Sequence, residues 1–476
     1  MLKRLSQVFS QAPGIGGALI LALGCPSHAV CAGTPDETAA ALAQTALTNS
    51  GAMEILSSLT TEIGPRLAGS EAEKRAAAWA TQRFTAFGFD KVWIESFPLA
   101  HGWVRGLERA EVTSPSPQPL VVTALGGSVA TPLDGIEAEM ALFKTYAELL
   151  AMPTNSLAGK IVVVTQPMFR AQDGAGYGAL IQMRTAGPSE AARRGAVAYL
   201  LRSLGTDSHR VAHTGGTHYA ADAPRIPAAA LAVPDAEQLD RLVALGRPVR
   251  IRLRLTTRDL GPVTSQNVIA EIKGREKPDD VVLVGAHLDS WDLGTGAIDD
   301  GAGVAIVMAA TKLIRELPEP PRRTIRVVLF GSEEPGVVGG NAYAKAHQAE
   351  LSHYVIAAEP DLGQGPVYRF QTGVANPDEP SLQRIRAALA PLGVVRGDNH
   401  SHGESDVGPL AERQVPAVTL ELDATDYFDL HHTPDDTFDK VKPERINQSA
   451  AAYAAFTYLA AELDGDYRQA GAVPVK

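Results

Sequence analysis

The chain has 476 residues, of which 45% are hydrophobic and 20% are charged, and its formal net charge is −11. This length suggests about two domains, and the composition is typical of a globular protein. There is no basic stripe, and no run of about 18 apolar residues follows the N-terminus, so we expect neither a nucleic-acid partner nor a membrane span in the mature chain.

The first 32 residues are predicted to be an export signal. Two basic residues near the start precede the apolar stretch "GIGGALILALG", and small residues then allow cleavage after Ala29 or Ala32. We therefore expect a periplasmic or secreted protein. A disordered, weakly apolar N-terminus is the alternative, and Cys25 makes a poor lipoprotein anchor. Both cysteines, Cys25 and Cys31, lie here, so no internal disulfide is expected in the mature chain.

Residues 33–122 are predicted to begin the main domain. The stretch "EAEKRAAAWATQRFTAF" from Glu71 has its apolar residues at helical spacing, and Gly88 is a typical helix end. The following "KVWIESFPL" is predicted to be a strand. "SPSPQP" at 114–119 is predicted to be a loop-rich break.

Residues 123–258 are predicted to form a smaller, β-rich α/β domain inserted into the main one. Strands are expected in "GKIVVVTQP", in the second half of "PSEAARRGAVAYLLRS", at the start of "RIPAAALAVPDAEQLDRLVALG" and in "VRIRLRLTT". Helices are expected between them, one of them beginning at Pro234 and Asp235. This stretch has no cluster of metal-ligand residues.

Residues 259–476 return to a regular alternation of strands and helices. Strands are predicted at 267–273, 281–286, 325–330, 354–358 and 416–422, with helices at 302–316, 338–350 and 379–392. The predicted fold class is α/β, with a mostly parallel or mixed sheet sandwiched by helices. Ligands of such sheets bind at the carboxyl ends of the strands.

Acidic residues and histidines gather where these strands end. They are His287 with Asp289, Asp299 with Asp300, Glu333 with Glu334, Asp361, and His431 with His432. Singly, such an acid is usually a helix cap and such a histidine a surface or core residue. Together, adjacent acid pairs would repel each other unless a cation lay between them.

The types of ligand predict the metal. Imidazole and carboxylate without thiolate suit zinc, with cobalt or manganese as substitutes. Two histidines and at least three acids exceed one catalytic tetrahedral site, which favours two metals that share a bridging carboxylate. An acid left over would be the general base.

The chain resembles the M28 family of zinc peptidases, most closely its carboxypeptidase Q branch. The matching stretches are "IGPRLAGS", "WVRG", "GAHLDSWDLGTGAIDDGAG", "LFGSEEPGVVGG", "EPDLG", "SDVGP" and "DYFDLHHTPDDT". They extend over nearly the whole mature chain. The resemblance implies the zinc exopeptidase fold, and the insertion resembles a protease-associated domain.

The resemblance implies two Zn²⁺ ions per chain and a set of ligands for each. One ion would be held by His287, Asp299 and Asp361. The other would be held by Asp299, Glu334 and His432, with Asp299 bridging.

Further roles follow from the same resemblance. Glu333 would be the general base, and Asp289 would orient His287. A cis peptide is expected between Asp299 and Asp300. His431 is less favoured as a ligand than its neighbour. Tyr427 is a candidate donor to the developing oxyanion, although a tyrosine at this place is commonly just packed.

The expected activity is that of a metallodipeptidase or carboxypeptidase acting on short peptides with free termini. An aminopeptidase acting on longer peptides is the alternative. A receptor-like protein without catalysis is disfavoured because the full ligand set and the base are present. A single-zinc cyclase of the same fold is disfavoured by the two-metal ligand set. A homodimer is one oligomeric state that the sequence leaves open.

Overall fold

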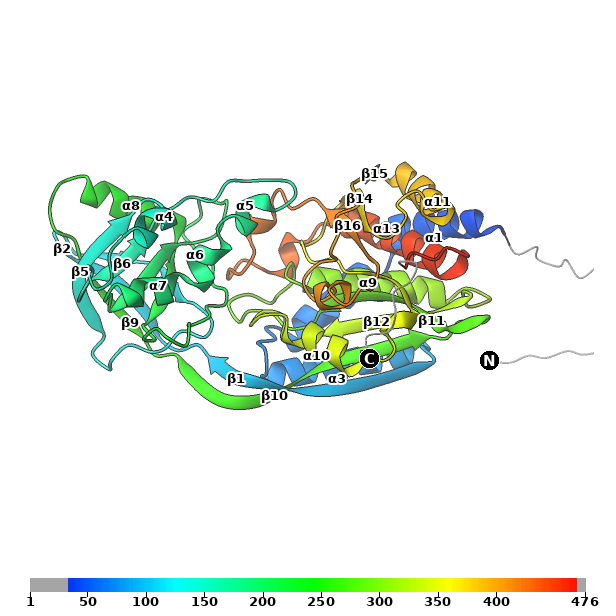
Figure 1. Cartoon of the computed structure of the whole chain (residues 1–476), viewed down its shortest axis with the longest axis horizontal. Coiled ribbons are helices and arrows are strands. Elements are labelled where there is room, and N and C mark those ends of the chain that lie inside the picture. Colours follow the sequence, from blue (N-terminus) through cyan, green and yellow to red (C-terminus); the bar gives the residue numbers. More distant parts are fainter. Residues whose placement is uncertain (1–32, 469–476) are drawn as a thin grey trace, which may run out of the picture.

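The computed structural model describes residues 33–468, which form two parts joined side by side (Figure 1). Each part is built on its own eight-stranded sheet. The predicted export signal, with Cys25 and Cys31, lies outside the described residues. Between residues 33 and 468 there is no helix of the length and apolarity that crossing a bilayer requires.

The first sheet has the strand order β1-β10-β12-β11-β13-β16-β14-β15. Its middle strands β12, β11, β13 and β16 are parallel, whereas β1, β10 and β14 pair antiparallel with their neighbours β10, β12 and β16. The predicted mixed α/β sheet is thereby confirmed. The strands are β1 Lys91–Val104, β10 Arg258–Ile272, β11 Lys277–His287, β12 Arg323–Phe330, β13 Tyr354–Ala358, β14 Val367–Gly373, β15 Val395–Arg396 and β16 Ala417–Leu422.

Helices cover both faces of the first sheet. One face packs against α1 Pro35–Asn49, α2 Ala52–Ser58, α3 Glu71–Ala86, α9 Gly301–Arg315, α11 Pro380–Leu389 and α13 Pro443–Glu462. The other face packs against α10 Val338–Ala346 and α12 Gly408–Ala411. Because helices bury both faces, β13 and β16 consist of buried residues throughout, which explains their apolar sequences.

The second sheet has the order β3-β2-β9-β5-β6-β7-β8-β4. Its strands are β2 Glu108–Ser114, β3 Gln118–Leu120, β4 Val122–Ala124, β5 Ile136–Phe143, β6 Ile161–Val164, β7 Ala198–Arg202, β8 Ala228–Leu231 and β9 Arg250–Leu255. One face packs against α8 Val233–Val243, and the other against α4 Tyr146–Leu150, α6 Ile181–Thr185 and α7 Gly187–Arg193. The short α5 Ala175–Gly178 lies toward the first part (Figure 1).

Strand pairing extends the second sheet to the N-terminal side of residue 123. β2 and β3 pair with each other, and β2 also pairs with β9. The break predicted at 114–119 corresponds to the short turn between β2 and β3. The pairing places the change from one sheet to the other just before Glu108, earlier than the predicted boundary.

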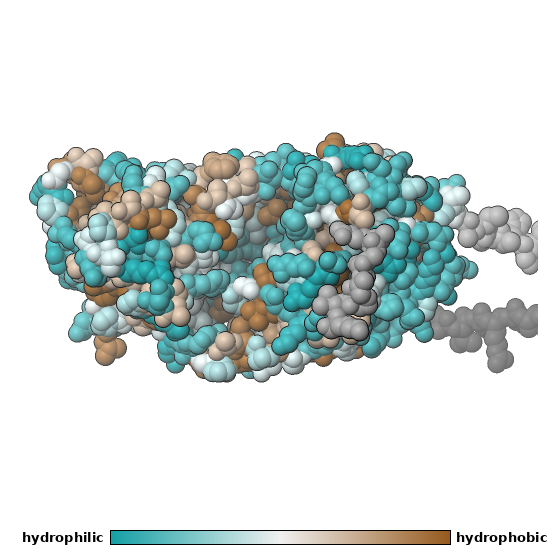
Figure 2. Space-filling model, in the orientation of Figure 1, coloured by the Kyte–Doolittle hydropathy of each residue, from teal (hydrophilic) through white to brown (hydrophobic). Residues whose placement is uncertain are grey.

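A two-stranded ribbon connects the two parts. β1 and β10 pair antiparallel from Lys91 opposite Glu271 to Val104 opposite Arg258. In Figure 1 they run along the lower edge of the molecule from the first sheet toward the second. Figure 2 shows more hydrophobic surface over the part with the second sheet, where Leu133 and Leu245 are exposed.

Candidate metal centre

The candidate site residues meet at the carboxyl ends of the parallel strands. His287 ends β11, and Glu333 and Glu334 follow β12. Asp361 follows β13, and His432 lies in the segment after β16. The arrangement follows from topology, since parallel strands bring their carboxyl ends to one edge of the sheet.

The carboxylate of Asp299 lies between two imidazoles. Its Oδ1 is 3.0 Å from His287 Nε2, and its Oδ2 is 3.0 Å from His432 Nε2. Each histidine also faces a second acid: His287 Nε2 is 3.4 Å from Asp361 Oδ1, and His432 Nε2 is 3.1 Å from Glu334 Oε2. Two groups of donor atoms therefore share one carboxylate.

Asp300 is turned away from this shared carboxylate. The peptide bond between Asp299 and Asp300 is cis, as the resemblance implies. The carboxylate of Asp300 accepts the backbone N–H of Gly303, which caps α9, and the backbone N–H of His287. Its oxygens are close enough to His287 and Asp361 to join a metal site, but both already serve the backbone.

His431 lies close to the proposed metal ligands, although the sequence favours its neighbour His432 as the ligand. Its ring stacks on that of His432 with 3.4 Å between centroids, and its Nε2 is 3.6 Å from Asp299 Oδ2. Burial, with the neighbouring His432, holds the pKa of His431 well below its usual range, so the ring is neutral. We interpret His431 as a wall of the centre and His432 as the imidazole that faces both acids.

The electrostatics of the site fit a bound cation. Burial raises the pKa of Glu333 well above its usual range, and that of Glu334 is raised for the same reason. Burial disfavours charge on His287 and His432 too. Even so, the adjacent acids hold the pKa of His287 well above normal and raise that of His432 to about 9. Positive charge is thus favoured between these acids, and metal ions are one way to supply it.

The donor set also fits a metal. Glu334 Oε1 is buried and has no hydrogen-bond partner among the described residues, so it is free to bind an ion. All the facing donors are imidazole nitrogens or carboxylate oxygens, a combination that suits zinc.

The outer contacts differ in part from the prediction for Asp289. His287 Nδ1 contacts the main-chain oxygen of Asp289 at 3.0 Å, whereas the carboxylate Oδ1 is 3.8 Å away. That carboxylate accepts instead the backbone N–H groups of Glu333 and Glu334, at 2.9 and 3.3 Å. Asp289 therefore fixes His287 through its backbone and the glutamate pair through its side chain.

A cavity of about 320 Å³ opens over the centre. Tyr427 lines it and is 6% exposed, with its ring 5.0 Å from that of His431. Burial raises the pKa of Tyr427 well above normal, so its hydroxyl keeps its proton and can act as a donor.

The part with the second sheet supplies residues that sequence reasoning missed. Thr214 O lies 3.2 Å from His432 Nδ1, and Arg184 Nη1 lies 3.4 Å from the same nitrogen. Arg184 and Tyr177 line the cavity, and the guanidinium lies over the tyrosine ring at 5.3 Å. Their sequence segment carries no ligand motif, so only the contact between the two parts reveals them.

Two further acids near the centre are not among the predicted site residues. Asp436 accepts the backbone N–H groups of Ile298 and Asp299, and so holds the segment that carries the bridging carboxylate. Glu404 lines the cavity. Burial, followed by the charges of nearby acids such as Asp361, raises the pKa of Glu404 to about 8. "DDT" after the histidine pair was a signal for Asp436, and the signal for Glu404 was its place directly before the matching stretch "SDVGP".

Comparison with known proteins gives concordant matches. The model of peptidase family M28 matches residues 267–457. The chain is 34% identical to carboxypeptidase Q of Homo sapiens, over 86% of this chain and 85% of that protein.

Solved structures agree with these matches. The crystal structure of a peptidase M28 precursor from Shewanella amazonensis has a TM-score of 0.90 and 46% identity, and the match covers 91% of this chain and 98% of that one. A zinc aminopeptidase from Bacillus subtilis has the same fold, with a TM-score of 0.61 and 21% identity over 88% of this chain and 97% of that one. This chain belongs to peptidase family M28 and is a metallopeptidase.

Proposed function

We propose that this chain is a two-zinc exopeptidase that hydrolyses short peptides with free termini, dipeptides above all. The observation that carries the proposal is the carboxylate of Asp299, which presents one oxygen to His287 and the other to His432. A carboxylate placed between two donor groups is the arrangement that a two-metal site needs. The similarity to carboxypeptidase Q supports the exopeptidase assignment.

The residues that would hold the metals fall into two groups. His287, Asp299 and Asp361 would hold one ion, and Asp299, Glu334 and His432 the other. When bound, zinc would acidify a water molecule and polarise the scissile carbonyl. The nitrogen and oxygen donors support zinc, as does the zinc aminopeptidase of the same fold.

Proton transfer is assigned to Glu333. Its backbone N–H donates to the Asp289 carboxylate, which fixes the start of the segment beside the centre. The Glu333 side chain lines the cavity over the metal ligands. It would take a proton from the attacking water and deliver it to the departing amine nitrogen. Tyr427 lines the same cavity and would donate its hydroxyl proton in a hydrogen bond to the developing oxyanion.

An arginine on one wall of the cavity and a buried glutamic acid on another support the preference for free termini, since a substrate ammonium group would favour the ionised form of that glutamic acid. Arg184 comes from the second-sheet part and is the one lysine or arginine, among the described residues, that lines the cavity. Its Nε is buried without a hydrogen-bond partner in that same range. Glu404 comes from the first-sheet part. We assign Arg184 to the carboxylate end of the peptide and Glu404 to its ammonium end.

Size also supports a short substrate. The cavity of about 320 Å³ is bounded by residues of both parts, so the space directly over the metal ligands suits a small substrate. A site that pairs terminal charges also discriminates against blocked peptides, because its own charged groups would then be left unpaired.

The test compares specificity constants of the zinc-loaded enzyme. A free dipeptide, its N-acetylated form, its C-amidated form and a decapeptide with the same first residues are each assayed, and bound zinc is counted. We expect two zinc ions and a loss of at least about 100-fold on blocking either end. If the decapeptide or the acetylated peptide is cleaved as well as the free dipeptide, the dipeptidase assignment is wrong.

The alternative activity is an aminopeptidase acting on longer peptides, which the aminopeptidase of the same fold favours. It predicts a different pattern in the same assay: loss on acetylation, little loss on amidation, and efficient release of the first residue from the decapeptide.

The organisation of the whole chain completes the proposal. We infer a discontinuous peptidase domain with a protease-associated-like insertion, and the strand pairing supports a start near Glu108 instead of residue 123. The chain would be exported and freed of residues 1–32. N-terminal sequencing of the secreted protein tests the cleavage, and light scattering decides whether it forms a homodimer.

A further inference from the structure

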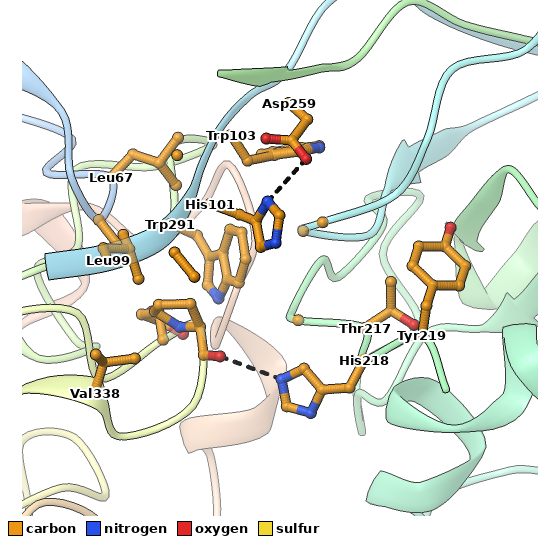
Figure 3. A pocket seen from close by; sticks show the side chains of 18 of the residues that line it. Leu67, Leu99, His101, Trp103, Thr217, His218, Tyr219, Asp259, Trp291 and Val338 are labelled. Carbon is orange, nitrogen blue, oxygen red and sulfur yellow. Dashed lines mark hydrogen bonds and ion pairs between the residues drawn. The ribbon is translucent and has the colours of Figure 1, made fainter. Parts of the chain in front are cut away.

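A second cavity, of about 500 Å³, lies beside the metal centre. Figure 3 shows its walls: the apolar side chains of Leu67, Leu99, Trp103, Trp291 and Val338 come from the first-sheet part, and Thr217, His218 and Tyr219 of the second-sheet part lie opposite. Polar and charged side chains also line it, among them Arg225, Asp259 and Glu334, and His101 Nδ1 is 3.0 Å from Asp259 Oδ2 with both of these side chains about half exposed.

This apolar cavity adjoins the metal-centre cavity. Gly216, His218 and Glu334 line both. Glu334 also faces His432, and the ring of Trp291 lies 5.9 Å from that of His432 between centroids. A peptide held at the metal centre would therefore have the apolar cavity within reach of a side chain next to its scissile bond.

One buried donor in the cavity wall has no partner. Trp291 is 7% exposed, and its Nε1 has no hydrogen-bond acceptor among the described residues. In Figure 3 the indole nitrogen lies on the His218 side of the ring. The nearby Trp103, in contrast, donates its Nε1–H to Ser128 O at 3.0 Å. A buried N–H without an acceptor is costly, so an acceptor supplied by the ligand would be stabilising.

The walls are held in place before any ligand binds. Trp291 packs edge-on against Trp103, and a Cβ on Gly126 would come within 1.8 Å of the Trp291 ring. His218 Nε2 contacts Pro335 O at 3.2 Å, which ties the second-sheet part to the segment before Val338. The wall side chains therefore need little further ordering when a ligand binds, and such preorganisation favours affinity.

We propose that this cavity is a specificity pocket for a bulky aliphatic or aromatic side chain of the residue on one side of the scissile bond. The proposal rests on the peptidase function proposed above and narrows its substrate class. The Trp291 N–H would donate to a main-chain oxygen of the same substrate residue. Small residues would bind poorly, since they would leave most of the apolar wall uncovered.

The test uses two series of free dipeptides, X-Ala and Ala-X, in which X is Ala, Val, Leu or Phe. With zinc-loaded wild-type enzyme, kcat/KM should rise at least about tenfold from Ala to Leu or Phe in one series. Val338→Phe would fill the pocket and should lower the Phe-to-Ala ratio of kcat/KM at least fivefold in that series.

The matched control is Val243→Phe. This valine ends α8, is 40% exposed and does not line the cavity, so the ratio and the activity should stay at wild-type values. Leu67→Ala removes part of the apolar wall, so it should also lower the Phe-to-Ala ratio of kcat/KM. Thermal melting of each variant separates loss of the pocket from loss of the fold.

Trp291→Phe keeps an aromatic wall and removes the N–H. We expect kcat/KM to fall several-fold for all X alike while the ratio holds. If this variant matches wild type toward every dipeptide, the N–H has no substrate acceptor.

The outcomes separate this inference from the proposed function. If zinc-loaded wild-type enzyme hydrolyses no free dipeptide, the proposed function itself fails. If Ala-Ala is hydrolysed but the size of X changes kcat/KM in neither series, or if folded Val338→Phe and Leu67→Ala both keep the ratio, the specificity pocket alone is wrong.

Discussion

At the scale of residues, the adjacent Glu333 and Glu334 lie in one turn but have different proposed roles. Glu334 Oε2 lies 3.1 Å from His432, whereas no hydrogen bond joins the Glu333 carboxylate to another described residue. The Asp289 carboxylate holds the backbone of both. One carboxylate thus anchors the backbone of both glutamates, while their side chains have different neighbours. We therefore expect substitutions of Glu333 and of Glu334 to have different effects.

We expect Glu333→Gln to keep both metals and lose turnover by at least about 100-fold, because only proton transfer is removed. Glu334→Gln should lose one equivalent of zinc, because one ligand oxygen is replaced. Metal analysis and kcat for free dipeptides measure the two effects. Glu412→Gln, exposed at the end of α12, is the control. Retention of two zincs by Glu334→Gln with loss from Glu333→Gln would reverse the assignment.

The pKa of the same base predicts how activity depends on pH. Burial raises the pKa of Glu333, and a base must be ionised to act, so a raised pKa moves the acid limb of activity upward. Acid also protonates His287 and His432 and so competes with metal binding. Turnover should therefore fall steeply below about pH 6. A zinc-loaded enzyme with undiminished kcat at about pH 4.5 would contradict this expectation.

At the scale of elements, the C-terminal helix α13 is central to the core. Most residues of Pro443–Glu462 are buried, and the helix packs against α1, α9 and α11. Phe456 is fully buried and lies against Phe370 of β14 with 5.9 Å between ring centroids. The stability of the first-sheet part should depend on it.

Phe456→Ala should lower the free energy of unfolding by about 3–5 kcal/mol, since it removes a large side chain from a packed core. Leu245→Ala, at a residue 63% exposed, should change it by less than about 0.5 kcal/mol. Urea denaturation followed by fluorescence compares the two. A loss below about 1 kcal/mol for Phe456→Ala would mean that the core collapses around the gap.

Sequence patterns predicted most strands of the first sheet but not α13 or β14. A helix buried on nearly all sides lacks the apolar stripe that identifies a surface helix, and Ala-rich stretches add little contrast. β9 was predicted more easily because its exposed arginines alternate with buried residues. The ligand candidates could likewise be recognised in the sequence because they follow predicted strands. Arg184 and Glu404, in contrast, reach the site only through tertiary contacts.

At the scale of the whole molecule, the two parts meet at the loop that carries the histidine pair. Thr214 N donates to His432 O at 3.0 Å, and His213 Nδ1 contacts His431 O at 2.8 Å. Arg170 joins the same loop, with Nη2 2.6 Å from Asp429 Oδ1. The position of the histidines therefore depends on the docking of the second part.

We expect Arg170→Ala to lower kcat/KM for free dipeptides by about 3- to 10-fold with zinc content unchanged, because the loop loses an anchor but no ligand. Arg241→Ala, on the exposed side of α8, is the matched control and should behave as wild type. Equal kinetics for the two variants would show that docking at Arg170 does not position the site.

The ribbon of β1 and β10 also sets an order of events during synthesis. About 150 residues separate its two strands, so at about 5–20 residues per second β1 leaves the ribosome on the order of ten seconds before its partner exists. Of the second sheet, β4 to β8 are made in that interval, whereas β9, which joins β2 to β5, is made only just before β10. Until β10 arrives, the long edge of β1 is open to pairing with other nascent chains. We therefore expect aggregation during expression to begin at this unpaired strand edge.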